Sequence, residues 1–133
     1  MKTELMTTEK MRLEVERLWI KHIKLCQDNF LYFVQEVWPD FVCKKSTDPK
    51  EWGHHQIIAK EFTDIADQRK GRLLINMPPR HTKSEFASVH YPAWMIGKYP
   101  KLKIMQVSHN TELAARFGAK VRNIIDSKEY KQI

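Results

Sequence analysis

A lysine followed by a serine, placed after a short turn, is the feature of this sequence with the clearest chemical potential. Lys83 and Ser84 end the segment Met77-Pro78-Pro79-Arg80-His81-Thr82-Lys83-Ser84. Where such a segment leads into a helix, backbone N–H groups point toward a bound anion. A lysine ammonium can then contact the terminal phosphates of a nucleotide, and a serine hydroxyl can coordinate Mg²⁺. Lys83 and Ser84 fit these two roles.

The residues around this lysine leave a second interpretation open. The general phosphate-loop pattern has a glycine six residues before the lysine and another directly before it. Here these two positions hold Met77 and Thr82. The pattern by itself is therefore also compatible with an ordinary turn between a strand and a helix, capped by Thr82.

Arg80 lies inside the same turn. Its guanidinium could contact the γ-phosphate and stabilise the charge that develops during phosphoryl transfer. It could instead pair with a nearby acid and order the loop. Arg80 and Lys83 are the candidate catalytic residues and Ser84 is the candidate Mg²⁺ ligand. The candidate nucleotide contacts in the turn are Pro79, Arg80, His81, Thr82, Lys83 and Ser84.

Three helices are expected before this turn. Residues 9–26 carry Met11, Val15, Leu18, Trp19 and Ile23 at helical spacing, which predicts an amphipathic helix. A second helix is expected from an N-cap at Asp28 to the stop at Pro39, with its apolar side chains in the core. A loop over residues 39–52 and a third helix from Gly53, closed near Gly71, complete this part.

The turn itself is expected between a strand and a helix. The continuous apolar run Leu73-Leu74-Ile75 predicts a parallel strand that is buried on both faces. A helix is expected from Lys83, with a break at Pro92. A second strand over residues 103–108 and a last helix, capped by Asn110 or Thr111, follow. The sequence therefore predicts an α/β fold with an incomplete parallel sheet of the P-loop NTPase type, preceded by N-terminal helices.

Charge and cysteine content narrow the class of protein. The formal charge is +7, and the whole surplus lies in residues 71–133, which suits nucleotides or nucleic acid but is also compatible with a solvated basic face. Cys26 and Cys43 are too few for a disulfide framework, so a reducing, cytoplasmic setting is expected. Together with the adjacent His54 and His55 they lack the spacing of a zinc site. No apolar run approaches the length of a membrane span.

The segment from Arg72 to Glu85 resembles the deviant Walker A motif of tailed-phage terminase large subunits, in which a Pro-Pro-Arg-His-x-Lys-Ser loop is characteristic. Three further stretches resemble the same family, and the resemblance covers roughly residues 30–133. These stretches are Tyr91-Pro92-Ala93-Trp94, Gln106-Val107-Ser108-His109-Asn110-Thr111-Glu112-Leu113-Ala114 and Phe117-Gly118-Ala119-Lys120-Val121-Arg122-Asn123-Ile124-Ile125.

The resemblance implies a bacteriophage protein of the host cytoplasm that uses ATP and Mg²⁺ to drive double-stranded viral DNA into a capsid. It also implies a portal and a small terminase subunit as partners, a homo-oligomer of the full-length protein, and a separate nuclease domain. By position, Gln56 is similar to the glutamine with which many such ATPases read adenine, although a helical glutamine is usually only solvated. Residues 1–52 would form an N-terminal helical region and loop, and residues 53–133 the first part of the ATPase domain.

One element of an ATPase is not recognisable in the sequence. Hydrolysis needs a strand that ends in Asp and Glu to activate water, and the nearest imitation, Ile124-Ile125-Asp126, continues the helical spacing before it. The resemblance implies an ATPase and nuclease for the parent protein, whereas this chain alone is expected to be inactive. The rival hypothesis is a non-enzymatic helical module that binds nucleic acid through basic side chains. Its candidate contacts are Lys98, Lys101, Lys103, Arg116, Lys120 and Arg122.

Overall fold

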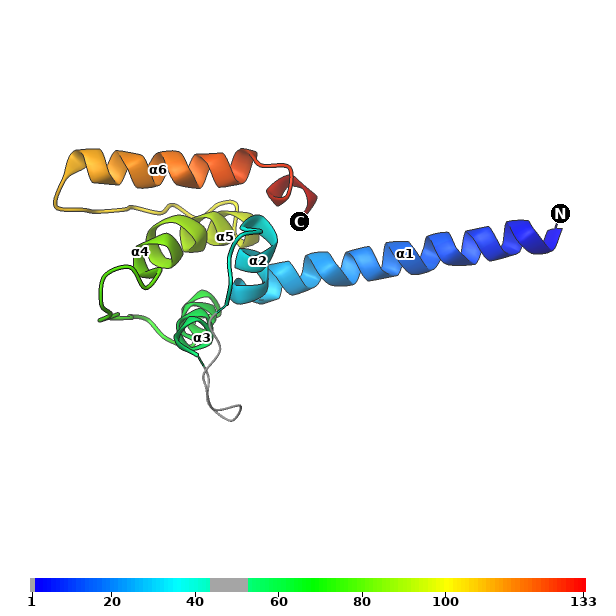
Figure 1. The fold of residues 1–133 in the computed structure, drawn as a ribbon, viewed down its shortest axis with the longest axis horizontal. Helices are drawn as coiled ribbons and strands as arrows, with labels where there is room; N and C mark the ends of the chain where they lie inside the picture. The colour runs from blue at the N-terminus through cyan, green and yellow to red at the C-terminus, as the bar shows by residue number, and fades with distance from the viewer. Residues whose placement is uncertain (1, 44–52) are drawn as a thin grey trace.

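The computed structural model describes residues 2–43 and 53–133, and these residues fold into a helical assembly (Figure 1). The helices in chain order are α1 (Lys2–Asp28), α2 (Phe30–Val37), α3 (His54–Ala66), α4 (Lys83–Glu85), the π-helix η1 (Phe86–His90), α5 (Tyr91–Lys98), α6 (Thr111–Asp126) and the 3₁₀-helix η2 (Tyr130–Gln132). The predicted boundary at residue 52, like most of the predicted loop, lies outside the described residues.

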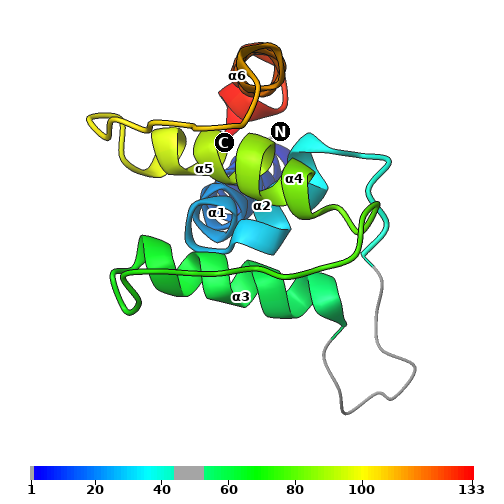
Figure 2. The same cartoon turned by 90° about the vertical axis from the view of Figure 1, so that its left-hand side faces the viewer.

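The core forms where α2 packs between α3 and the segment from α4 to α5 (Figure 2). Phe30 on α2 is fully buried at its centre, and its ring contacts aromatic rings of the neighbouring helices. The distances between ring centroids are 5.3 Å to Phe62, 5.5 Å to Phe86, 5.8 Å to Tyr91 and 5.4 Å to Trp94. Burial of these large apolar surfaces is the main force that holds the helices together.

The prediction of an α/β fold with a parallel sheet is wrong, because the part of the chain that the structure describes contains helices but no strand. Residues 73–77 and 102–108 are extended, yet no backbone hydrogen bond joins the two segments. Figure 2 shows why: residues 73–77 run along α3, whereas residues 102–108 lie between α5 and α6. Strand pairing requires two backbones about 4.8 Å apart, and the intervening helices separate these segments.

The burial of the first extended segment also differs from the prediction. Leu73 and Ile75 pack against the core, but Leu74 between them is 86% exposed. This alternation is the pattern of an extended segment with one covered face. The second segment is more open still, since Met105 is 87% and Val107 80% exposed. The prediction of a strand buried on both faces is therefore wrong for this apolar run, both in its pairing and in its burial.

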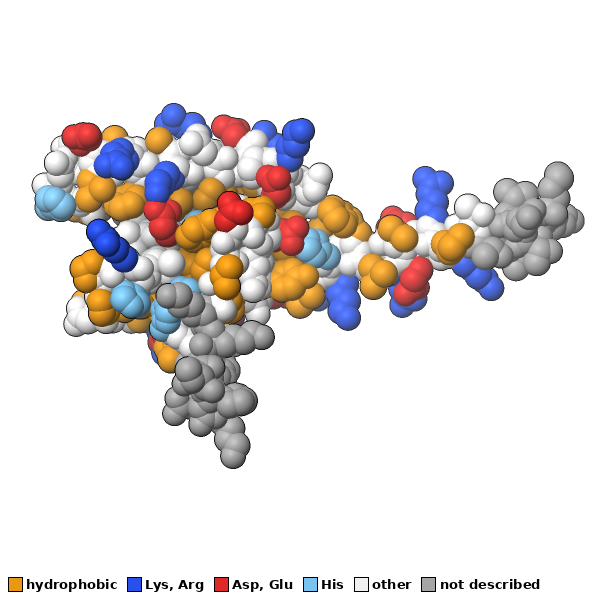
Figure 3. Space-filling model, in the orientation of Figure 1, with side chains coloured by type: hydrophobic (Ala, Val, Ile, Leu, Met, Phe, Trp, Pro, Cys, Tyr) orange, Lys and Arg blue, Asp and Glu red, His pale blue; other side chains and the backbone are white. Residues whose placement is uncertain are grey.

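The predicted first helix exists, but its apolar face is not part of the core. Helix α1 projects away from the other helices as a long rod (Figure 1), and hydrophobic side chains line its surface (Figure 3). Met11, Val15, Leu18 and Trp19 are all exposed. Although α1 has 27 residues, neither it nor any other helix in the described ranges is apolar enough to span a membrane.

Two valines provide a matched test of this exposure. Val15 on α1 is 66% exposed and Val34 on α2 is fully buried. We expect Val34→Ala to lower the free energy of unfolding by about 2 kcal/mol, because the change removes buried methyl groups and leaves a cavity. Val15→Ala should change it by less than about 0.5 kcal/mol, since alanine favours helix and no packing is lost. Urea unfolding of both variants measures the difference, and equal losses would contradict the exposed position of α1.

Caps define the ends of two helices. Asn29, rather than the predicted Asp28, caps α2, because its side chain accepts a hydrogen bond from the Tyr32 N–H at 3.0 Å. Asn110, one of the two predicted caps, begins α6 and accepts a hydrogen bond from the Glu112 N–H at 2.7 Å, whereas Thr111 is the first residue of the helix. Asp126 lies in the last turn of α6, so the prediction that it continues this helix is confirmed.

The predicted break at Pro92 is absent, and a π-helix replaces it. Proline has no N–H to donate and its ring crowds the carbonyl four residues earlier. The backbone widens into η1 directly before α5, and the helix continues. The Ser88 carbonyl, which an N–H at position 92 would reach in an α-helix, accepts a hydrogen bond from the Gln106 side chain at 3.0 Å.

Helix α3 ends earlier than predicted, and without the use of Gly71. Gln68 takes the left-handed conformation with φ of 59°. The Arg69 N–H donates to the Asp64 carbonyl at 2.8 Å and the Gln68 N–H to the Ile65 carbonyl at 3.0 Å. These two bonds form a Schellman motif, which closes the helix at Ala66.

The Asp64 carboxylate forms ion pairs with three basic side chains at this end of α3, namely Lys60, Arg69 and Lys70. Its side chain is only 8% exposed and lies 2.9 Å from Lys60 Nζ and 3.1 Å from Arg69 Nη1. The hydrogen bond from Lys60, followed by the charges of Lys60, Lys70 and Arg69, lowers the pKa of Asp64 despite its burial. A carboxyl whose pKa is lower in the folded state stabilises the fold above its unfolded value near 4, and this contribution is lost as the pH falls below it.

Replacement of Asp64 tests this pH dependence. We expect Asp64→Asn to lower the urea midpoint at pH 7, because the amide keeps the shape of the side chain but loses the charge that the three cations contact. At pH 3 the difference from the parent chain should shrink, since the carboxyl of the unfolded parent chain then binds a proton that the folded chain must release. A difference that is the same at both pH values would contradict the assignment to Asp64.

Candidate phosphate-binding site

The predicted phosphate loop lies between the extended segment along α3 and the start of a long helix. Lys83 begins α4, and the backbone keeps helical dihedral angles through η1 and α5 as far as Lys98. The loop therefore faces the N-terminal end of a continuous helical segment. The aligned peptide dipoles and the N–H groups of such an end favour a negative charge.

Two residues of the loop have left-handed backbone conformations. Arg80 has φ of 64°, and Thr82 has φ of 60° and ψ of 1°. Such angles cost about 1–3 kcal/mol for a residue other than glycine, and β-branched residues adopt them least readily. Thr82 occupies the position directly before the lysine, where the general phosphate-loop pattern has glycine. The threonine thus adopts the conformation for which glycine is ordinarily used.

Side-chain hydrogen bonds offset this strain. The Thr82 hydroxyl donates to the His81 carbonyl at 2.6 Å, and its oxygen lies 2.9 Å from Nε2 of His55 on α3. Because the hydroxyl has a single proton, His55 Nε2 must be the donor in the second bond. His81 Nδ1 lies 2.9 Å from the Pro79 carbonyl and fixes the other side of the turn.

Lys83 lies across the loop. Its Nζ is 3.5 Å from the carbonyl oxygen of Met77, where the loop begins. The loop encloses a hollow of about 170 Å³, which is several times the space that one water molecule needs. The residues that line this hollow are Pro78, Pro79, Arg80, His81, Thr82, Lys83, Ser84 and Glu85.

Backbone donors are available at the same place. Within the described ranges, the N–H groups of Lys83, Ser84 and Glu85 donate to no backbone carbonyl, whereas the Phe86 N–H donates to the Thr82 carbonyl at 2.9 Å. Neighbouring N–H groups at a helix start form a binding site for an anion. The three amides and the Lys83 ammonium are the donors that a phosphate group would use.

Arg80 is exposed at the edge of the hollow. No ion pair of Arg80 is present among the described residues, so the alternative in which it pairs with an acid to order the loop is not realised there. The acid of the loop, Glu85, instead forms an ion pair with Lys120 of α6. This pair holds α6 against the helix that starts at Lys83.

The structure therefore brings the loop residues predicted to bind phosphate to one hollow. No family model, curated protein or solved structure matches the chain. The loop geometry, the chemistry of the side chains and the sequence resemblance are therefore the features that bear on its function.

Gln56 does not reach this hollow. Its Oε1 accepts a hydrogen bond from the Gly53 N–H at 2.9 Å and so closes the first turn of α3. The side chain lines a separate hollow beside Asn29, Lys60 and Arg69. A role for Gln56 in contact with adenine stays a prediction.

His55 is the residue of the site that the sequence did not reveal. It is 2% exposed and packs against two aromatic rings, with ring centroids 4.9 Å from Phe41 and 5.4 Å from Phe86. The sequence drew attention to it only as one of two adjacent histidines. Its contact with Thr82 joins positions 27 residues apart, and no local pattern carries that information.

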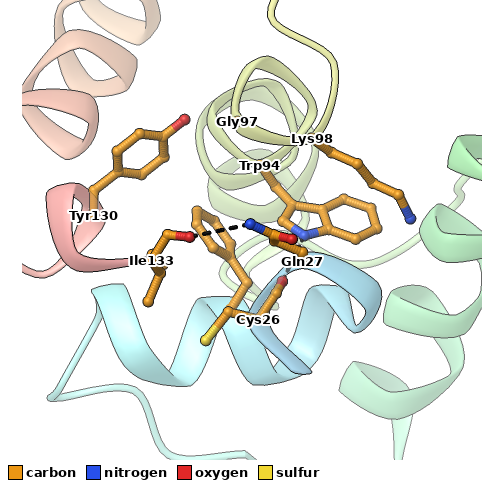
Figure 4. Close-up of a pocket in the computed structure, with 8 residues that line it drawn as sticks. Cys26, Gln27, Trp94, Gly97, Lys98, Tyr130 and Ile133 are labelled. Atoms are coloured by element: carbon orange, nitrogen blue, oxygen red, sulfur yellow. Dashed lines mark hydrogen bonds between the residues drawn. The ribbon is translucent and has the colours of Figure 1, made fainter. Parts of the chain in front are cut away.

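A third hollow, of about 110 Å³, lies between the end of α1, α5 and η2 (Figure 4). Trp94 Nε1 donates to the Cys26 carbonyl at 2.8 Å, and the Gln27 side chain donates to the Ile133 carbonyl at 3.3 Å. Burial raises the pKa of the Cys26 thiol to about 11, which keeps it protonated and unreactive. These groups are satisfied within the fold, so this hollow reflects packing between helices.

Proposed function

We propose that residues 78–85 bind the phosphates of ATP together with Mg²⁺, and that this chain is the nucleotide-binding part of a viral DNA-packaging motor. The observation that carries the proposal is the conformation of Thr82. A left-handed residue directly before Lys83 leaves the amides of the helix start and the ammonium of Lys83 around one hollow. This arrangement suits a polyphosphate far better than an uncharged ligand.

Each loop residue has a distinct task in this proposal. The ammonium of Lys83 leaves the Met77 carbonyl, at 3.5 Å a weak partner, for the terminal phosphates. The exposed guanidinium of Arg80 contacts the γ-phosphate and stabilises the charge that develops on it. The Ser84 hydroxyl at the edge of the hollow holds Mg²⁺, which neutralises phosphate charge when bound.

The resemblance to terminase large subunits supplies the rest of the proposal. It rests on the run from Pro78 to Ser84 and on the three further stretches of the chain. In this role ATP hydrolysis drives double-stranded viral DNA into a capsid in the host cytoplasm. The partners are a portal, a small terminase subunit and further copies of the full-length protein.

A binding titration tests the nucleotide site directly. We expect a fluorescent ATP analogue to bind the chain in the presence of Mg²⁺ and to be displaced by unlabelled ATP and by inorganic triphosphate, because the predicted contacts are to phosphates. Adenosine without phosphates should not displace it. Absence of saturable binding, or displacement by adenosine alone, would refute the phosphate-loop proposal.

A basic nucleic-acid-binding module is the second candidate function, and the charge surplus of residues 71–133 favours it. Two of its six candidate contacts, however, already form ion pairs within the chain. Lys98 pairs with Asp67 at 3.0 Å and lies over the Trp94 ring, and Lys120 pairs with Glu85. Along α6 the three basic residues, Arg116, Lys120 and Arg122, stand between the acidic residues Glu112 and Asp126, and Figure 3 shows both kinds of charge on this face. The remaining candidates are Lys101, Lys103, Arg116 and Arg122.

Salt dependence separates the two candidates. A module that binds DNA through several phosphates should lose affinity steeply as salt rises, and Arg116→Ala or Arg122→Ala should reduce that slope. Neither change should alter the ATP titration, because both residues lie outside the loop hollow. Tight DNA binding without any nucleotide binding would favour the second candidate.

A further inference from the structure

The conformation of the phosphate loop depends on one residue that is unfavourable there. Thr82 has φ of 60° and is β-branched, so an isolated chain would rarely adopt this turn. Glycine at the same position would adopt it without strain. A contact from another part of the chain must therefore stabilise the left-handed conformation of Thr82.

The side chain of His55 is placed to do this. Its Nε2 donates to Thr82 Oγ1 at 2.9 Å, while the threonine hydroxyl donates to the His81 carbonyl at 2.6 Å. The ring itself cannot turn freely, because it is 2% exposed and packs against the rings of Phe41 and Phe86, which also contact each other. A buried donor on α3 thus fixes both the hydroxyl and the backbone of the loop.

We propose that His55 is a positioning residue for anion binding, which holds Thr82 left-handed so that Lys83 and the following amides face the same hollow. This inference rests on the proposed phosphate-binding function. Without the bond from His55, Thr82 relaxes toward negative φ and the N–H groups of Lys83 and Ser84 turn away from the position of the phosphate. His55 itself touches no ligand.

Two changes remove the bond while they preserve shape. His55→Phe keeps an aromatic ring against Phe41 and Phe86 but has no donor, and Thr82→Val keeps the branched shape but has no hydroxyl. We expect each to weaken binding of Mg-ATP roughly tenfold, as befits one hydrogen bond. His55→Gln, which carries a donor near the position of Nε2, should restore most of the loss. Thermal melts identify any variant that is not folded, and Thr82→Val serves as the test if His55→Phe unfolds.

The decisive comparison uses glycine at position 82. Because glycine adopts the left-handed conformation unaided, His55→Phe should have less than about a twofold effect when Thr82→Gly is already present. A full tenfold loss in the glycine background would show that His55 acts through packing elsewhere, and would overturn the proposal. No loss from His55→Phe or Thr82→Val in the threonine chain would overturn it as well.

A measurement without nucleotide distinguishes this proposal from the proposed function. In the parent chain, which has Thr82, the backbone amide NMR signals of residues 81–85 should shift when His55→Phe is introduced. In the Thr82→Gly variant the same change should leave these signals in place. Unchanged signals in the threonine chain would refute the positioning role, whatever the chain binds. If the signals shift as expected but the parent chain binds no Mg-ATP or triphosphate, the positioning contact stands and the phosphate-binding function fails.

Discussion

Replacement of Lys83 by alanine is expected to weaken Mg-ATP binding at least roughly 100-fold, because it removes the charged donor closest to the phosphates. The lysine stem is half-buried and its ammonium reaches back to the Met77 carbonyl at 3.5 Å, so the side chain is already directed across the hollow. The alanine side chain creates no clash and favours helix. Calorimetric titration with Mg-ATP measures the loss, and thermal unfolding verifies that the fold is retained.

Lys101 is the matched control for this change. It is an exposed lysine that lies outside the loop hollow. Lys101→Ala removes the same charge from the chain as Lys83→Ala, so any general effect of net charge on the binding of an anion appears in both variants. We expect Lys101→Ala to retain affinity within about twofold. Equal losses in the two variants would mean that ATP is attracted by overall charge and not bound by the loop.

The order and most positions of the helices could be predicted from the sequence, because caps and periodicity are local. Asn110 and the apolar spacing after it were sufficient to place α6. The sheet was predicted wrongly, because the run Leu73-Leu74-Ile75 indicates extended backbone but does not say what lies beside it. In the structure its neighbour is α3 and not a second strand.

Burial was the second property that local patterns could not settle. The spacing of Met11, Val15 and Leu18 predicts a helix with an apolar face, and that helix exists. A periodic pattern identifies which side chains can be buried together, whereas burial itself requires a surface to pack against. Helix α1 reaches beyond the other helices, so these side chains stay exposed.

In the candidate site, too, the residues of one short run could be predicted from the sequence, whereas a contact from another helix could not. Lys83 and Ser84 were recognisable from their place in a short run of residues. Thr82 departs from the glycine of the general phosphate-loop pattern, yet its backbone adopts the left-handed conformation for which glycine is ordinarily used. The contact that offsets the strain comes from His55 on another helix, so the sequence pattern could not reveal it.

Phe30→Ala is expected to have the largest effect on stability of the changes considered, about 3–5 kcal/mol in the free energy of unfolding. The ring is fully buried on α2 and contacts rings from α3, η1 and α5. Its removal therefore opens a cavity where these three neighbours meet. A domain of this size has a total stability of only about 5–15 kcal/mol, so the melting temperature should fall by on the order of 10 °C or more.

Two further variants separate cavity formation from loss of any aromatic ring. Phe30→Leu keeps much of the buried volume and should cost about half as much, since the helices can close around leucine. Trp19→Ala removes a larger ring from α1, where the side chain is 45% exposed, and should cost less than about 1 kcal/mol. Because Phe30 and His55 both contact Phe86, partial loosening of the core in Phe30→Leu should also weaken Mg-ATP binding, which would tie the loop conformation to the packing beneath it. A Phe30→Ala chain as stable as the parent would show that α2 is not the centre of the core.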